Sequence, residues 1–146
     1  MLNGWKRCLF LVIFVGLIAP MMLSGCEVRE AAQQALQQET TIHEQMSRGN
    51  FDGIYYGADQ RYRDAIAPDK SNALFSGITK KLGSPLDCKQ GVTIVLHSTW
   101  GTSIKSECKT SFSKNATAIE TFIWIKSTDG QYYLGGYRIK SDALIE

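Results

Sequence analysis

Four cysteines carry the most distinctive chemistry in this 146-residue chain. A thiol can take up an acyl group, close a disulfide or bind a metal, and its surroundings decide which of these it does. Cys8 opens an apolar run near the N-terminus, and Cys26 follows the end of that run, directly after Leu-Ser-Gly. Cys88 and Cys108 lie far downstream, in a segment of mixed polarity. Cys26 and the downstream pair therefore call for separate explanations.

The first 25 residues have the charge order of a secretory signal. Lys6 and Arg7 precede an apolar run, residues 8–23, that contains no acidic residue. The run is interrupted by Pro20 and is shorter than the roughly 20 apolar residues that cross a membrane comfortably. The sequence LSGC at 23–26 resembles the lipobox of bacterial lipoproteins. In that family a peptidase cuts before the cysteine, and the cysteine thiol carries a diacylglycerol.

This resemblance implies a signal peptide at 1–25 and a mature chain, 26–146, that is lipidated at Cys26. Acyl chains such as palmitate would hold it firmly, because each buried methylene contributes about 0.8 kcal/mol. Glu27 stands where an Asp often retains lipoproteins at the inner membrane, so we expect an outer-membrane protein facing the periplasm. The alternative is an uncleaved signal anchor in which Cys26 is incidental.

The charge of the mature chain excludes one class of partner. Removing Lys6 and Arg7 from the 16 basic residues leaves 14, which equals the number of acidic residues. Nucleic-acid binding needs clustered excess Lys and Arg, so no nucleic-acid partner is expected.

Export would place Cys88 and Cys108 in an oxidising compartment, where two remaining thiols usually pair. Their loop of about 20 residues would add roughly 3 kcal/mol of stability. One register argument opposes the bridge: a hairpin turning at Trp100-Gly101 puts Thr93 opposite Cys108 and leaves Cys88 about 17 Å too far along. The bridge then requires a bulge, or residues 84–91 folding back. The cysteines and the two distant histidines lack zinc spacing, so no metal and no cofactor are predicted.

Apolar spacing predicts three helices in the first half of the mature chain. Residues 27–48 repeat apolar side chains every three or four positions, with Glu39 breaking the stripe. A short or irregular helix follows from Phe51, after the N-cap candidate Asn50. The third helix is expected to begin at Pro68 and to end at Gly83.

After Pro85 the apolar period changes to two, which predicts four antiparallel strands. The first covers residues 92–97, and the second, around 103–112, alternates most clearly, with residues 104, 106, 108, 110 and 112 facing inward. Residues 117–126 form the third strand, and the turn at Asp129-Gly130 leads into the fourth, 131–141. Gly135-Gly136 indicates a bulge in that strand. Helices followed by a strand meander predict an α+β domain, with helices packed on one face of a curved sheet.

Three stretches carry a second resemblance: GNFDGIYYGADQRYR, a helix ending in KKLGSP, and SFSKNATAIETFIWIKSTDGQYYLGGYRIKS. Together with the element order over residues 30–145, they resemble small bacterial proteins of the nuclear-transport-factor-2-like superfamily. The resemblance implies a cone-shaped, cystatin-like fold. That superfamily includes a ketosteroid isomerase, dehydratases, binding modules and lipoproteins, so the fold alone does not choose a function.

Two kinds of site fit this resemblance. An isomerase-like enzyme needs a carboxylate base in an apolar cone that faces a tyrosine or a protonated acid. The candidates for that arrangement are Asp52, Asp59, Glu120, Tyr55 and Tyr62. A ligand pocket would instead be lined by aromatic side chains, although core packing explains them more simply. The pocket candidates are Tyr55, Tyr62, Phe112, Trp124 and Tyr137. His43 and His97 are both expected near solvent.

The sequence therefore predicts a lipid-anchored envelope protein with no catalytic residues, which binds a small apolar ligand or another envelope protein. One alternative is an isomerase- or dehydratase-like enzyme that uses a carboxylate in the cone, and another is a structural or inhibitory lipoprotein of the cell envelope.

Overall fold

The computed structural model describes residues 23–145, with the backbone alone for residues 23–27. The predicted signal peptide lies almost entirely outside these residues, as does the side chain of Cys26. Within the described part, no helix is both long and apolar enough to span a bilayer.

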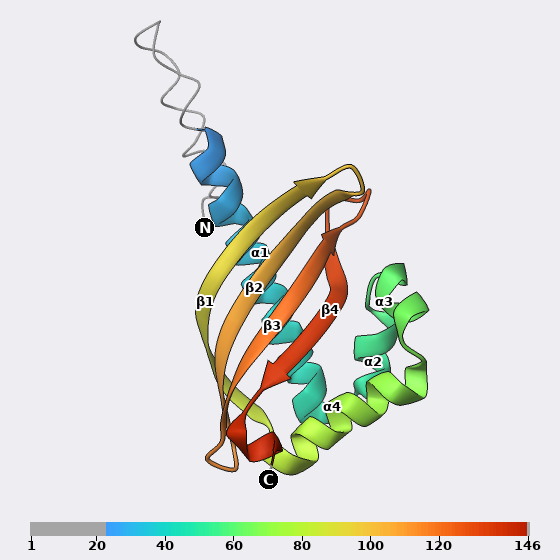
Figure 1. Ribbon diagram of the computed structural model, residues 1–146, viewed down its shortest axis with the longest axis vertical. Coiled ribbons are helices and arrows are strands. Elements are labelled where there is room, and N and C mark those ends of the chain that lie inside the picture. Colours follow the sequence, from blue (N-terminus) through green and yellow to red (C-terminus); the bar gives the residue numbers. More distant parts are fainter. Residues whose placement is uncertain (1–22, 146) are drawn as a thin grey trace, which may run out of the picture.

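Within the described residues, four α-helices precede the sheet, and Figure 1 labels them in chain order. They are α1 (Leu23–Arg48), α2 (Phe51–Tyr56), α3 (Gln60–Ala65) and α4 (Pro68–Leu82). The irregular second helix of the sequence prediction is resolved as α2 and α3, and the side chain of Asn50 caps α2 through the Gly53 amide. The predicted limits of α4 are confirmed, with Pro68 in its first turn and Gly83 at its end.

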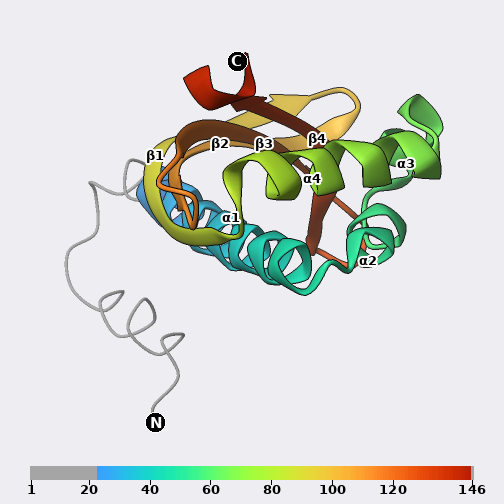
Figure 2. The ribbon, with the colours of Figure 1, turned by 90° about the horizontal axis from the view of Figure 1, so that it is seen from below.

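Four strands form one antiparallel sheet in the order β1-β2-β3-β4, which confirms the predicted α+β meander. They are β1 (Pro85–Ser98), β2 (Gly101–Phe112), β3 (Thr117–Lys126) and β4 (Tyr132–Lys140), and η2 (Asp142–Leu144) follows. The strands are visibly bent, and α1 runs along one face of the sheet (Figure 2). The other α-helices pack beside α1 and β4, and no α-helix of the described residues covers the opposite face of the sheet (Figures 1 and 2).

The predicted start of the first strand and its register were both wrong. β1 begins at Pro85 rather than at residue 92, and Cys108 pairs with Gln90 instead of Thr93. A bulge between Gln90 and Thr93 shifts the register and places Cys88 diagonally across from Cys108. Their Cα atoms are 5.6 Å apart and their sulfur atoms are joined, so the bulge removes the geometric objection to the disulfide.

The bulge predicted in the fourth strand is confirmed. Gly136 pairs with Ile123 and Leu134 with Trp124, so Gly135 is the extra residue. A Cβ on Gly135 would collide with the side chain of Ile125, which explains why the bulge needs glycine.

The core lies between α1, α4 and the inner face of the sheet. A row of rings crosses it: Phe75 from α4 contacts Tyr137, Tyr137 contacts Phe122, and Phe122 stacks on Trp124. The centroid distances are 4.9, 5.2 and 5.3 Å. These aromatic contacts tie helix α4 to the two C-terminal strands.

A tight approach at the end of α4 generates a prediction. Gly83 has φ +92°, and a Cβ there would lie against the Ser113 hydroxyl and 2.9 Å from the Lys114 amide nitrogen. Gly49 has φ +69° with open space around it. We expect Gly49→Ala to lower the free energy of unfolding by about 1 kcal/mol, the cost of a left-handed residue. Gly83→Ala should cost about 1–3 kcal/mol more, because the β2–β3 turn must move.

Urea denaturation of both variants measures this difference. Equal losses at the two glycines would mean that the junction between α4 and the β2–β3 turn tolerates displacement.

Candidate functional site

Two glutamates are buried between α1 and the sheet, and they organise the only polar cluster that we identify among the buried residues of the described chain. Glu39 comes from α1 and Glu120 from β3, and both are 0% exposed. Three further buried side chains complete the cluster: Ser106 and Thr110 on β2, and Trp124 on β3. They share the inner face of the sheet, because alternate residues of a strand point to the same side.

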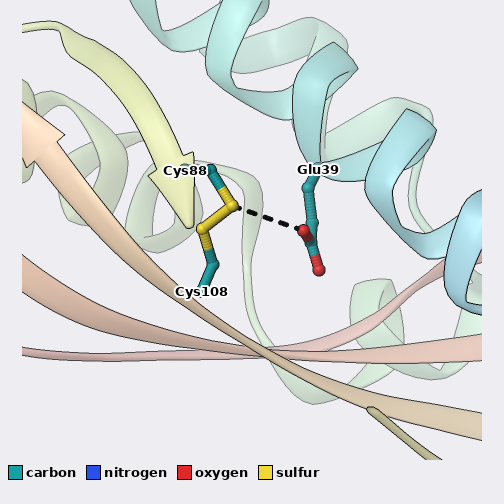
Figure 3. A group of neighbouring side chains, drawn as sticks. All are labelled: Glu39, Cys88 and Cys108. Atoms are coloured by element: carbon teal, nitrogen blue, oxygen red, sulfur yellow. Dashed lines mark hydrogen bonds between the residues drawn. A yellow bond between two sulfur atoms is a disulfide. The ribbon is translucent and has the colours of Figure 1, made fainter. Parts of the chain in front are cut away.

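Glu39 is held at both carboxyl oxygens. Ser106 donates a hydrogen bond to Oε1 at 2.5 Å, and Ser106 accepts one from the Trp124 indole at 2.9 Å. Oε2 lies 3.7 Å from the Cys88 sulfur of the disulfide, and Figure 3 shows the carboxyl directed at that bond. A disulfide sulfur has no proton to donate, so this contact suits a carboxyl oxygen that carries the proton itself.

The surroundings of Glu39 favour that neutral form. Burial raises the pKa of the Glu39 carboxyl, and the nearby Glu120 adds to the rise. The hydrogen bond from Ser106 and the proximity of His43 lower this pKa but do not cancel the effect of burial.

Glu120 has a richer set of partners. Tyr137 donates to Oε1 at 2.5 Å, His43 Nε2 lies 2.7 Å from Oε2, and Thr110 also donates to Oε2. Burial, followed by the charge of Glu120, raises the pKa of the Tyr137 hydroxyl well above its usual value, so this hydroxyl remains a donor. The Thr110 oxygen also lies 3.2 Å from the Cys108 sulfur, which links the Glu120 group to the disulfide.

The expectation for His43 was wrong, and so was the description of Glu39 as a break in the apolar stripe. The His43 side chain is 11% exposed and pairs with Glu120. The buried positions of α1 are 31, 35, 39, 42 and 46, so Glu39 continues the stripe. Its position four residues after Ala35 and three before Ile42 was the available signal.

Of the enzyme candidates, the structure places only Glu120 in a buried polar cluster. Asp59 caps α3 through the Arg61 amide, and Asp52 accepts a hydrogen bond from Asn72 at the surface. Tyr55 donates to the Arg63 carbonyl, and Tyr62 pairs with Ser71. Burial raises the pKa of Tyr62 despite the hydrogen bond from Ser71.

The predicted pocket residues belong to the packed interior. Tyr55, Tyr62, Phe112 and Trp124 are all buried in the core cluster, and Tyr137 packs against it. Two hollows on the described surface are lined by other residues. One, of about 380 Å³, lies between the second half of α1 and the start of β1 and reaches His43 and Cys88.

Glu39, Cys88 and Cys108 offer three potential metal-ligand atoms within 4.8 Å of one another (Figure 3). In the oxidised state both sulfurs are committed to the disulfide, and a protonated carboxyl is a poor ligand. The arrangement of these three residues therefore fits a structural crosslink better than a metal centre.

Glu120 and Tyr137 form the kind of acid and donor pair that proton-transfer enzymes use. In the described structure, however, the Glu120 oxygens contact protein groups, and the carboxyl is closed off from solvent. A substrate atom would have to displace one of these partners to reach it.

Comparison with known proteins adds no family assignment: no protein-family model and no curated protein matches the chain. The roles of the buried residues follow from their contacts.

The raised pKa of Glu39 leads to a prediction with a defined sign. A folded-state pKa above the ordinary 4.5 means that stability is greatest below that pH and falls as the pH rises toward the folded-state pKa. Glu39→Gln keeps the acceptor for Ser106 and cannot ionise. We expect this variant to be as stable as the native chain or more stable at pH 7, and to lose that advantage near pH 4.

Denaturant unfolding at both pH values measures the effect, with Glu39→Ala as the control. The alanine variant should lose about 2–4 kcal/mol at either pH, because it leaves a cavity and an unsatisfied Ser106. A glutamine variant that is destabilised only at pH 7 would mean that Glu39 is ionised in the folded protein.

Proposed function

We propose that this chain is a bacterial lipoprotein, anchored through Cys26 to the outer membrane and facing the periplasm. Its domain, with a cone-shaped fold of the nuclear-transport-factor-2-like superfamily, would serve as a non-catalytic module that binds another envelope protein. An apolar groove on the surface, combined with a filled interior, carries this proposal.

The interior argues against a small apolar ligand held inside the sheet. Such a ligand needs an open cavity, whereas the aromatic side chains that would line it pack against one another. A filled core combined with an exposed apolar surface is the combination that favours a protein partner.

The groove lies where β3 begins and β4 ends. It has a volume of about 660 Å³, and its apolar lining consists of Ala118, Ile119, Ile139, Leu144 and Ile145. Lys109, Lys140 and Asp142 supply charged groups at the same site. Apolar contacts surrounded by charges are typical of protein interfaces.

The position of the groove suits an anchored protein. Figure 1 shows η2 and the start of β3 at the end of the molecule opposite the start of α1. A lipid at Cys26 would hold the start of α1 at the membrane, so the groove would face the periplasm.

An acid–base enzyme is the second candidate, and the Tyr137–Glu120 hydrogen bond is the observation that favours it. Because Glu120 is closed off from solvent and saturated with protein partners, we rank catalysis below binding.

The anchor predicts a specific mass. Protein extracted from membranes with detergent should begin at Cys26 and carry the added mass of acyl chains, and Cys26→Ser should prevent both changes. Intact denatured mass spectrometry makes the measurement. A native chain that begins at Met1 without added mass would refute lipidation and the outer-membrane assignment.

The groove predicts a position-specific contact. A photo-crosslinking residue at position 119, introduced into the full chain in the producing bacterium, should give a discrete adduct of one mass. Adding Ile145→Asp should abolish that adduct, because a charge in the groove opposes apolar docking. The same photo-crosslinking residue at the exposed Thr128 is the control. Identical adducts from positions 119 and 128 would indicate random collision and contradict a groove partner.

A further inference from the structure

The tip of the β1–β2 hairpin has an unusual composition. Residues 91–104 contain no Asp, Glu, Lys or Arg, although they include the turn and the ends of both strands. The first charged residues on either side are Lys89 and Lys105. Hairpin tips in water normally carry polar and charged residues, so an uncharged tip of this length needs an explanation.

Apolar side chains of this tip face outward. Val92, Ile94 and Leu96 alternate along β1, away from the core, whereas Val95 packs inward. Trp100 in the turn is 83% exposed. The register is fixed by continuous pairing from Thr93–Ser106 to Ser98–Gly101, so the exposure is a property of the folded hairpin.

The tip lies at the same end of the molecule as the start of α1. Gln90 on β1 donates a hydrogen bond to the carbonyl of Ala32 in the first half of α1. Pro85, at the start of β1, and Arg48, at the end of α1, line the same hollow. β1 therefore runs antiparallel to α1, and its last residues point toward the side where α1 begins. Figure 1 shows the hairpin tip and the start of α1 together at the upper end of the long axis.

We propose that residues 92–100 of the hairpin form a second membrane contact, with Trp100 seated in the head-group region of the bilayer that holds the lipid on Cys26. This inference rests on the proposed lipid anchor. Tryptophan favours the interface, where its ring is partly buried and its N–H stays hydrated. The absence of charged side chains on residues 91–104 lowers the cost of entering that layer. Lys105, which also pairs with Glu107 at 3.3 Å, has the sign that suits phosphate groups.

A bilayer explains these observations better than a protein partner at the same place. The charged groups that lie beside the tip in space are basic: Arg61 on α3 donates a hydrogen bond to the Trp100 carbonyl, and Lys105 pairs with Ile94 across the two strands. Basic groups next to an apolar, tryptophan-bearing tip suit the phosphates of a lipid surface. The proximity of the anchor also raises the local concentration of lipid around the hairpin, so that even a weak apolar contact would be occupied.

Tryptophan fluorescence can test this contact directly. The mature chain contains only Trp100 and Trp124, and Trp124 is buried in the core. The full lipidated chain would be reconstituted in vesicles of phosphatidylethanolamine and phosphatidylglycerol with brominated acyl chains, which quench only nearby tryptophan. We expect the Trp100 emission to be quenched and shifted to shorter wavelength. Trp100→Phe should remove the quenched component and leave the Trp124 emission.

A matched pair of leucines on one strand provides the control. Leu96→Asp places a charge in the tip and should abolish most of the quenching, whereas Leu86→Asp, at the far end of β1, should leave it unchanged. Both leucines are exposed in the native chain, at 49% and 68%. A loss of quenching in Leu96→Asp alone supports the membrane contact.

Three outcomes would overturn the proposal. Vesicle-bound, acylated protein with unquenched Trp100 would leave the anchor intact and refute the hairpin contact. Unquenched Trp100 with concentration-dependent crosslinking between tips would assign the surface to a second copy of the chain. A chain without acyl mass that does not sediment with vesicles would refute the anchor, and the hairpin contact with it.

Discussion

The burial of Glu39 beneath the sheet is the constraint on which the arrangement of this domain depends. A buried carboxyl is tolerated only where its oxygens find partners, so α1 can take few positions across the sheet. Glu39 meets Ser106 on β2, and His43, one turn later, meets Glu120 on β3. Two residues that lie four apart on one face of α1 therefore reach partners on two neighbouring strands of the sheet. Glu120 extends this connection to Tyr137 on β4.

The disulfide completes the same arrangement from the edge of the sheet. β1 is an edge strand, and its first half would otherwise be held by β2 pairing and a few contacts with α1. The bulge after Gln90 allows Cys88 to reach Cys108, and the sulfur of Cys88 then lies against Glu39. The edge strand, the helix and the neighbouring strand are thus joined at one buried point.

The buried cluster of Glu39, Glu120 and the disulfide lies between two surfaces with different properties. One end of the molecule presents the start of α1 and an uncharged hairpin tip, and the other presents an apolar groove with charges around it. Because the proposed anchor, membrane contact and partner groove lie along one axis, a lipid at Cys26 would orient the domain as well as tether it. Orientation matters for binding, since a partner that approaches from the periplasm would meet the groove rather than the hairpin.

Features that depend on local chemistry and on the apolar period could be predicted from the sequence. Pro68 and Gly83 delimited α4, Asp129-Gly130 placed the last turn, and the alternation along β2 assigned its two faces, because each of these signals acts within a few residues. Periodicity predicts which face a side chain occupies but not whether the space beyond it is filled. For that reason Trp124 and Tyr62 could be named as pocket residues, and the packing around them in the fold shows that they belong to the core.

The buried acids and the register of β1 also required the tertiary structure. The spacing of Glu39 along α1 indicated a buried position, but its partner Ser106 lies more than 60 residues away, as does Glu120, the partner of His43. No local pattern could therefore identify the groups that satisfy these two side chains. The distance between Cys88 and Cys108 depends on a one-residue bulge, and its position is set by pairing with β2 rather than by a turn residue. Local periodicity could therefore predict the helices and strands and the faces that they bury. Contacts between residues far apart in the sequence determine which polar groups meet in the core.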